Sequence, residues 1–81
     1  MKRIVFSERA RGDIRRLDRD TAMSILIALD RLASTGQGDV KRLKGESGEL
    51  RLRVGDYRVR FTEQSDTFEV SRVLHRKEAY R

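Results

Sequence analysis

The 81-residue chain is predicted to form an α+β domain of order β-αα-βββ, a two-helix hairpin packed on a small antiparallel sheet. Apolar residues at helical spacing dominate residues 8–35, whereas alternating, strand-like runs occupy residues 49–74. The length allows one domain, and no linker, repeat or low-complexity segment divides residues 1–81. Helices followed by strands are typical of an α+β architecture with one shared core.

The first elements are a short strand and a helix. Residues 2–6, KRIVF, form an apolar run that predicts an opening strand. Ser7 is a suitable helix N-cap, because its hydroxyl can accept a hydrogen bond from a backbone N–H of the first turn. Ala10, Ile14 and Leu17 fall at helical spacing and predict a first helix of about three turns.

The second helix has the clearest amphipathic pattern in the chain. Asp18 or Asp20 is expected to cap its start. Its apolar stripe consists of Ala22, Ile25, Leu26, Leu29, Leu32 and Ala33. These positions follow the i, i+3, i+4, i+7 pattern of a helix with one buried face. Thr35 and Gly36 are expected to end it, because glycine readily adopts the left-handed conformation of helix C-termini.

A basic, glycine-rich segment, GQGDVKRLKGESGE, is predicted to be a loop. Three runs then resemble strands, at residues 49–54, 57–62 and 68–74. Gly55 and Asp56 join the first two runs, and the polar stretch EQSDT joins the last two. The second half is therefore expected to form an antiparallel sheet.

The Gly-Asp turn fixes the register of the hairpin LRLRVGDYRVRF, residues 50–61. One face is apolar and carries Leu50, Leu52, Val54, Tyr57, Val59 and Phe61. On the other face, which we call the arginine face, Arg53 lies opposite Arg58 and Arg51 lies opposite Arg60. Like charges facing each other cost up to about 1 kcal/mol per pair. An anion bound to this face would relieve the repulsion.

The overall charge also indicates an anionic partner. Nineteen Lys and Arg against thirteen Asp and Glu give a net charge of +6. The cations are concentrated in residues 41–60, which favours a polyanion as the partner.

Cofactor and membrane sites are not expected. The chain has no cysteine and one histidine, so we expect no disulfide, no metal site and no cofactor. No apolar run is long enough to cross a bilayer, and Met1-Lys2-Arg3 leads straight into the opening strand without a signal peptide. A cytoplasmic location is therefore expected.

The C-terminal segment HRKEAYR adds the groups that the arginine face lacks. The unperturbed pKa of a histidine such as His75 lies near neutrality. Metal-free RNA cleavage needs cations at the phosphate, a proton shuttle and an aromatic surface for a base. His75, Arg76 and Tyr80, placed beside the arginine face, predict such a ribonuclease.

The succession of LKG, a basic alternating strand, GDYRVRF and HRKEAYR resembles the RelE/ParE superfamily of bacterial and archaeal toxins. The terminal HR…Y pattern resembles the RelE branch. This resemblance implies the toxin of a type II toxin–antitoxin system that acts as a ribosome-dependent, metal-free endoribonuclease. The 2′-hydroxyl of mRNA in the A site would attack the adjacent phosphate. A cognate antitoxin, the ribosome and mRNA would be the partners.

The same resemblance implies roles for individual residues. Arg58 matches the arginine that contacts the scissile phosphate, and Arg51 and Arg53 match a basic pair on the preceding strand. Arg76 matches the proposed acid for the leaving 5′-oxygen, and Tyr80 matches the aromatic that stacks on a nucleotide.

The general base is left open, because well-known active members carry lysines at the positions of Arg51 and Arg53. Arginine is a poor proton acceptor, with a pKa above about 12. His75 is the preferred candidate for the base, and Glu46 is the second.

Ribosomal RNA would be bound by further cations. Phosphates of 16S rRNA are expected to contact Lys41, Arg42, Lys44, Arg11, Arg15 and Arg16, with Arg60 as an outlying electrostatic contact.

Two other functions are compatible with the sequence. A ParE-like toxin would inhibit DNA gyrase with the same scaffold, although the HR…Y segment argues against this function. A non-catalytic RNA-binding module is supported by the arginines at positions 51 and 53.

Overall fold

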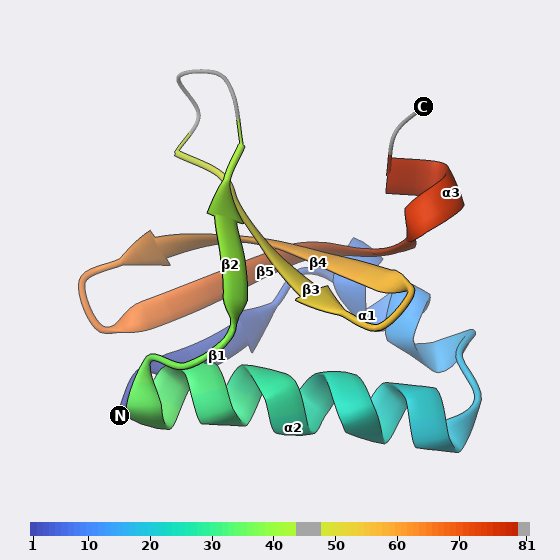
Figure 1. Cartoon of the computed structure of the whole chain (residues 1–81), viewed down its shortest axis with the longest axis horizontal. Helices are drawn as coiled ribbons and strands as arrows, with labels where there is room; N and C mark the ends of the chain where they lie inside the picture. Colours follow the sequence, from blue (N-terminus) through green and yellow to red (C-terminus); the bar gives the residue numbers. More distant parts are fainter. Residues whose placement is uncertain (44–47, 80–81) are drawn as a thin grey trace.

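The computed structural model of the chain describes residues 1–43 and 48–79 (Figure 1). The elements are β1 (Arg3–Phe6), α1 (Glu8–Arg15), α2 (Arg19–Thr35), β2 (Asp39–Arg42), β3 (Leu50–Val54), β4 (Tyr57–Gln64), β5 (Thr67–His75) and α3 (Arg76–Ala79). The predicted α+β class, with a helical hairpin packed on a sheet, is confirmed. In the described part of the chain, no helix has the length and hydrophobicity needed to cross a membrane.

The predicted helix boundaries are confirmed in α2. Asp18, rather than Asp20, is its N-cap, and the Asp18 carboxylate accepts a hydrogen bond of 3.1 Å from the Thr21 amide. Gly36 closes the helix with a φ of 78°, and its amide donates to the Leu32 carbonyl. Glycine adopts this left-handed conformation at little cost, whereas a residue with a side chain would be strained there.

Helix α1 is shorter than the three turns predicted. The Ser7 hydroxyl caps it by accepting a hydrogen bond from the Ala10 amide, but the helix ends after eight residues. The amides of Arg16 and Leu17 bond to carbonyls three residues earlier, which tightens the chain into a turn before α2. Leu17 therefore packs against the core from this turn.

The sheet has five strands in the order β1-β5-β4-β3-β2. The predicted β3–β4 register is confirmed at every position, including Leu52 opposite Val59 and Arg53 opposite Arg58. Of the two turn residues, Gly55 has a positive φ of 58°. A glycine at the first turn position is typical of the type II′ hairpin, whose twist matches that of the strands.

Two details of the predicted sheet are wrong. The sheet is mixed, because β1 runs parallel to β5, with Arg3 opposite Thr67 and Phe6 opposite Val70. The helical hairpin carries the chain from β1 to the far edge of the sheet, so β1 pairs with the last strand. The segment after α2 is also not wholly a loop, since β2 pairs with β3. All four residues of β2 are exposed, so no alternation of apolar residues marks it as a strand.

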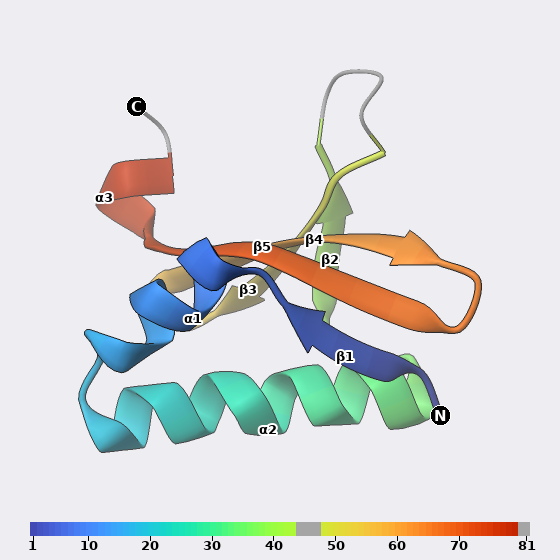
Figure 2. The ribbon, with the colours of Figure 1, turned by 180° about the vertical axis from the view of Figure 1, so that it is seen from behind.

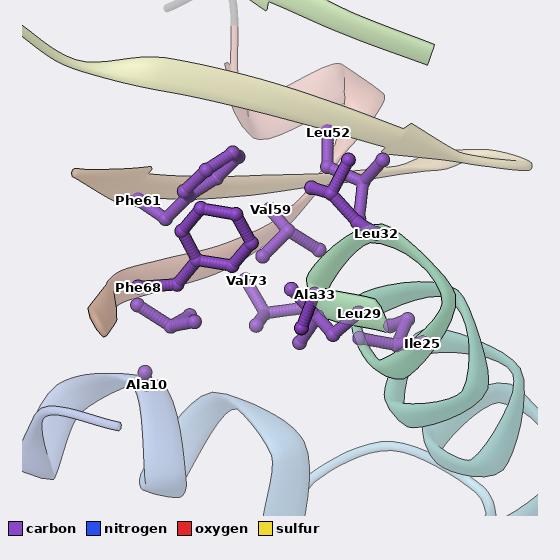
Figure 3. Close-up of a cluster of buried hydrophobic side chains, with 11 residues drawn as sticks. Ala10, Ile25, Leu29, Leu32, Ala33, Leu52, Val59, Phe61, Phe68 and Val73 are labelled. Atoms are coloured by element: carbon purple, nitrogen blue, oxygen red, sulfur yellow. The ribbon is translucent and has the colours of Figure 1, made fainter. Parts of the chain in front are cut away.

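The core lies between one face of the sheet and helices α1 and α2 (Figure 3). Its buried side chains are Ala10, Ile25, Leu29, Leu32, Ala33, Leu52, Val59, Phe61, Phe68, Val70 and Val73. The apolar face predicted for the hairpin is confirmed, with Leu50, Val54 and Tyr57 half-buried at its margin. The opposite face of the hairpin carries the four arginines.

Strand β1 covers only part of the edge of β5, and helix α1 lies along the rest of that edge (Figure 2). The Asp13 carboxylate is buried there and accepts hydrogen bonds of 2.9 Å from the Val73 amide and from Arg72 Nε. Burial raises the pKa of Asp13, but the bonds from Arg72 and Val73 and the charges of Arg72 and Arg16 outweigh burial and lower this pKa. Asp13 thus fixes the C-terminal half of β5, which leads to His75.

Candidate phosphate-binding face

The four hairpin arginines share the face of the sheet that points away from α1 and α2. The register places Arg53 opposite Arg58 and Arg51 opposite Arg60. Arg53 is exposed, Arg51 and Arg60 are half-buried, and Arg58 is only 6% exposed. Helix α3 lies on the same side of the sheet, at the end of β5 (Figure 1). Next to the β3–β4 turn, the arginine face therefore carries a buried arginine, Arg58, opposite an exposed one, Arg53.

Backbone carbonyls of the β3–β4 turn hold the Arg58 side chain in place. Its Nη1 donates hydrogen bonds of 3.1 Å to the carbonyls of Gly55 and Tyr57. Its Nε is buried and has no hydrogen-bond partner among the described residues. A buried, unpaired donor costs about 1–3 kcal/mol, more when the group is charged. The turn thus positions the guanidinium, while its buried Nε lacks an acceptor among the described residues.

Arg51 shows the same incomplete pairing. Its Nη2 lies 3.8 Å from an Asp39 carboxylate oxygen, and the side chain is 16% exposed. Arg51 Nε is also buried and has no partner among the described residues. Asp39 belongs to β2, a segment that the sequence predicts to be a loop, so its contact with Arg51 cannot be predicted from the sequence.

His75 lies at the same end of the sheet as Arg58 but on the other face. It is paired with Tyr57 across β4 and β5, and the two rings are edge-to-face with centroids 5.3 Å apart. Side chains alternate along a strand, so His75 shares the face of Tyr57, whereas Leu74 shares the face of Arg58. The structure therefore does not place the histidine ring on the arginine face.

The His75 ring is also tied to α3. Its Nδ1 accepts a hydrogen bond of 3.2 Å from the Lys77 amide, so the proton of a neutral ring resides on Nε2. The His75 amide donates to Glu78 Oε1 over 3.3 Å. These contacts fix the imidazole at the start of α3.

Arg76 is placed beside the β3–β4 turn. Its amide donates a hydrogen bond of 2.7 Å to the Asp56 carbonyl, which anchors the first residue of α3 on the turn. Its side chain is exposed. Arg58, His75 and Arg76 therefore lie near one turn, but the His75 ring is on the opposite face of the sheet from Arg58. The predicted residues Tyr80, Lys44 and Glu46 lie outside the described residues.

The cations predicted to bind ribosomal RNA form two flanks of the sheet. Arg11 and Arg15 on α1, and Arg16 at its C-cap, are exposed next to β5, where they line a hollow of about 460 Å³. Lys41 and Arg42 are exposed on β2, at the opposite edge of the sheet. The arginine face, including Arg60, lies between these flanks.

Asp13 and Asp39 are the charged residues of this region that the sequence did not reveal. Asp13 pairs with Arg72 and with Arg16, and Asp39 pairs with Arg51. Asp13 lies three residues after Ala10 and therefore on the same, apolar side of α1. This spacing is the sequence feature that could have indicated that Asp13 is buried. Within residues 1–43 and 48–79, no group of three His, Asp or Glu side chains could hold a metal ion.

Comparison with known proteins identifies the family. Residues 4–80 match the family described as ParE toxin of the type II toxin–antitoxin system parDE. Toxin RelE3 of Methanocaldococcus jannaschii is 45% identical over 42 residues, which is 52% of this chain and 48% of that toxin. The matched segment thus spans about half the length of this relative.

Solved structures show the same fold. The RelB–RelE antitoxin–toxin complex from Methanococcus jannaschii contains a chain with a TM-score of 0.78 and 26% identity, with 94% of both chains covered. The RelBE2 toxin–antitoxin complex from Mycobacterium tuberculosis gives a TM-score of 0.79 at 24% identity, covering 91% of this chain and 96% of that one. The chain therefore belongs to the ParE toxin family of type II toxin–antitoxin systems.

Proposed function

We propose that this toxin is a ribosome-dependent, metal-free endoribonuclease that cleaves mRNA in the A site. The observation that supports the proposal best is the cationic face on which Arg53 lies opposite Arg58 and Arg51 lies opposite Arg60. A phosphodiester supplies acceptor oxygens for guanidinium groups on this face.

The proposed reaction is an internal transesterification. The 2′-oxygen attacks the adjacent phosphorus and forms a 2′,3′-cyclic phosphate, while the bond to the 5′-oxygen breaks. Arg58 and Arg53 stabilise the negative charge that builds on the non-bridging oxygens in the transition state. Arg51 adds to the positive potential of the face, Arg76 acts toward the leaving 5′-oxygen, and Tyr80 stacks on a base.

The base that takes the 2′-hydroxyl proton is proposed to be His75, with Glu46 as the second candidate. In the described arrangement, Nδ1 of His75 is engaged by the Lys77 amide and the ring packs on Tyr57. To accept a proton from substrate on the arginine face, the ring must leave both contacts. Because α3 starts at the next residue, unwinding its first turn would release the ring.

The proposed partners follow from the charge distribution. The flanks formed by α1 and β2 would bind 16S rRNA phosphates, with Arg60 as an additional electrostatic contact. A cognate antitoxin would cover the cationic surface in a cytoplasmic complex, and two similar structures are toxin–antitoxin complexes. No cofactor and no membrane partner is proposed.

The test is expression of variants in cells, with growth and primer extension on translated messages as readouts. Arg58→Ala and Tyr80→Ala should lose growth arrest, and cleavage should fall at least about 100-fold, as for the loss of a transition-state donor. Arg31→Ala, at an exposed position of α2, is the matched control and should remain toxic. Circular dichroism verifies that each variant is folded. If folded Arg58→Ala remains fully toxic, the proposed site is wrong.

Gyrase inhibition is the second candidate, because the family match is to ParE toxins. In that case the arginines of the face would be less critical. Expression would induce the DNA-damage response while messages remain intact. A non-catalytic RNA-binding module would instead bind ribosomes without any cut in translated messages.

A further inference from the structure

We propose that the hollow beside α1 binds a free oligophosphate, a chain of linked phosphate groups such as inorganic tripolyphosphate or the phosphate tail of a nucleotide. The hollow lies where α1 packs against β5 (Figure 2). Its volume of about 460 Å³ is within the range of roughly 300–1,000 Å³ that is typical of small-molecule sites. Binding at this hollow requires neither the ribosome nor mRNA, so it is independent of the nuclease function proposed above.

The lining of the hollow is strongly cationic. Among the described residues, five arginines line it against two carboxylates, those of Glu8 and Asp13. Small-molecule sites are usually lined by apolar side chains, so this lining selects a highly charged anion instead. The planar guanidinium group suits phosphate in particular, because two of its N–H donors can bind two phosphate oxygens at once. The arginines are Arg9, Arg11, Arg15, Arg16 and Arg72.

Two of these guanidinium groups converge on one point of the hollow. A Cβ atom at Gly12 would lie 3.9 Å from Arg16 Nη2 and 4.0 Å from Arg15 Nη2. Both arginines are exposed, and Gly12 places no side chain between them. Like charges at such a separation repel each other, and a bound anion would relieve the repulsion. We therefore place a phosphate group above Gly12.

The buried carboxylate of Asp13 does not neutralise this cluster. Its Oδ2 accepts hydrogen bonds of 2.9 Å from Arg72 Nε and from the Val73 amide. Its Oδ1 accepts a hydrogen bond of 3.3 Å from Arg72 Nη2 and lies 3.5 Å from Arg16 Nη1. Asp13 thus holds Arg16 by one nitrogen while the other lies close to Gly12. One carboxylate shared between two arginines leaves the hollow with an excess of positive charge.

Helix stability does not explain the cations of α1. Arg9 and Arg11 lie near the start of the helix, where the helix dipole disfavours positive charge. Arg11 and Arg15 are four residues apart, a spacing at which like charges destabilise a helix. The dipole favours a cation only near the end of the helix, as at Arg15. Binding of an anion gives these residues a function that compensates for their cost to the helix.

The compactness of the cluster favours an oligophosphate over RNA. In an oligophosphate, neighbouring phosphorus atoms share a bridging oxygen, whereas in RNA a ribose separates successive phosphates. Two guanidinium groups close to one point match the denser charge of linked phosphates. Arg11, Arg15 and Arg16 are also the cations of this flank proposed to bind 16S rRNA, so a bound oligophosphate would compete with the ribosome. This consequence, unlike the site itself, rests on the proposed function.

The first experiment follows backbone amide NMR signals of the isolated toxin during titration with sodium tripolyphosphate, ATP or orthophosphate. Divalent cations are omitted, and about 150 mM NaCl screens long-range attraction. The Gly12 amide should shift saturably with tripolyphosphate, at a concentration at least about tenfold below that needed for orthophosphate. ATP that binds as tightly as tripolyphosphate would assign the site to nucleotides, and weaker ATP binding would assign it to inorganic chains. The Gly55 amide, beside Arg58, is the internal control. A response at Gly55 without one at Gly12 would overturn the proposal.

The second experiment measures tripolyphosphate affinity of folded variants by calorimetry. Arg15→Ala should weaken binding at least about tenfold, because it removes one of the two guanidinium groups above Gly12. Glu8→Gln should tighten binding by about two- to threefold, because it removes a negative charge from the lining. Arg31→Ala, exposed on α2, is the matched control and should bind normally. Equal affinities of all four proteins, the unsubstituted toxin included, would show that the hollow is not the site.

Competition with RNA separates the proposed ligand from polyanions in general. A single-stranded RNA of the same net charge should displace tripolyphosphate only at a concentration at least about tenfold higher than tripolyphosphate itself. Displacement by RNA at equal concentration would contradict the oligophosphate assignment. A toxin that binds tripolyphosphate at Gly12 but does not bind ribosomes would support this site and contradict the function proposed above.

Discussion

At the scale of single residues, Arg58 is the most informative side chain in the molecule. The sequence predicts its strand, its register and its face, and all three are confirmed. Its burial and its bonds to Gly55 and Tyr57 could not be predicted, because they depend on how the turn folds back on the guanidinium. The position of the His75 ring could not be predicted either, because it depends on contacts with Tyr57 and with the Lys77 amide of α3.

Asp13 provides a test of stability at this scale. Asp13→Asn removes the charge that pairs with Arg72. The free energy of unfolding, measured in urea at pH 7, should therefore fall by about 2 kcal/mol. Because folding lowers the pKa of Asp13, its ionised form stabilises the protein above the unfolded pKa of about 3.9. This stabilisation is lost as the pH falls through the lower folded value.

The difference between Asp13→Asn and the unsubstituted protein should therefore shrink on acidification, as measured by urea titrations between pH 7 and pH 2. Asp30→Asn, exposed on α2, is the control and should change the unfolding free energy by less than about 0.5 kcal/mol at pH 7. A constant Asp13→Asn effect across this pH range would show that its charge does not stabilise the fold.

At the scale of elements, helices with clear periodicity and caps were predicted well. The two-residue turn was sufficient to give the β3–β4 register, because slipping by one residue would bury the arginines. Strand β2 was missed because it is exposed on every residue and owes its conformation to pairing with β3. The parallel pairing of β1 depends on contacts between the two ends of the chain, which local patterns do not encode.

Two glycine-to-alanine substitutions should have opposite effects on thermal stability. Gly36→Ala places a side chain at a φ of 78° and should destabilise the fold by about 1 kcal/mol. Gly12→Ala lies inside α1, where a Cβ atom would approach only the ends of Arg15 and Arg16 at 3.9–4.0 Å. It should stabilise the fold by roughly 0.5–1 kcal/mol. Calorimetry of both variants checks the signs, and destabilisation by Gly12→Ala would refute this description of α1.

At the scale of the whole molecule, the cations proposed for catalysis and those proposed for binding ribosomal RNA lie on different parts of the surface. Its arginine face carries the groups proposed to act on the scissile phosphate, and α1 and β2 carry cations on either side. Helix α1 lies beside β5, and β2 is the strand at the far edge of the sheet, so an RNA surface that contacts both would cross β4 and β3.

Ribosome binding should therefore depend steeply on salt. Each phosphate contact contributes roughly 0.7–0.9 to the slope of log affinity against log salt concentration. Arg11→Ala on α1 should lower the slope by about that amount, as measured by co-sedimentation with ribosomes at increasing salt. Arg31→Ala on α2 should leave the slope unchanged. Binding that is insensitive to salt would argue against a multi-phosphate contact.

In the proposed reaction, the 2′-hydroxyl of the message is the nucleophile. The most direct measurement uses ribosomes programmed with an mRNA that carries a single 2′-deoxynucleotide at the expected A-site cleavage position. We predict cleavage of the all-ribose message, with a 2′,3′-cyclic phosphate among the products, and none at the substituted position. Equal cleavage of the two messages would show that the 2′-hydroxyl is not the nucleophile.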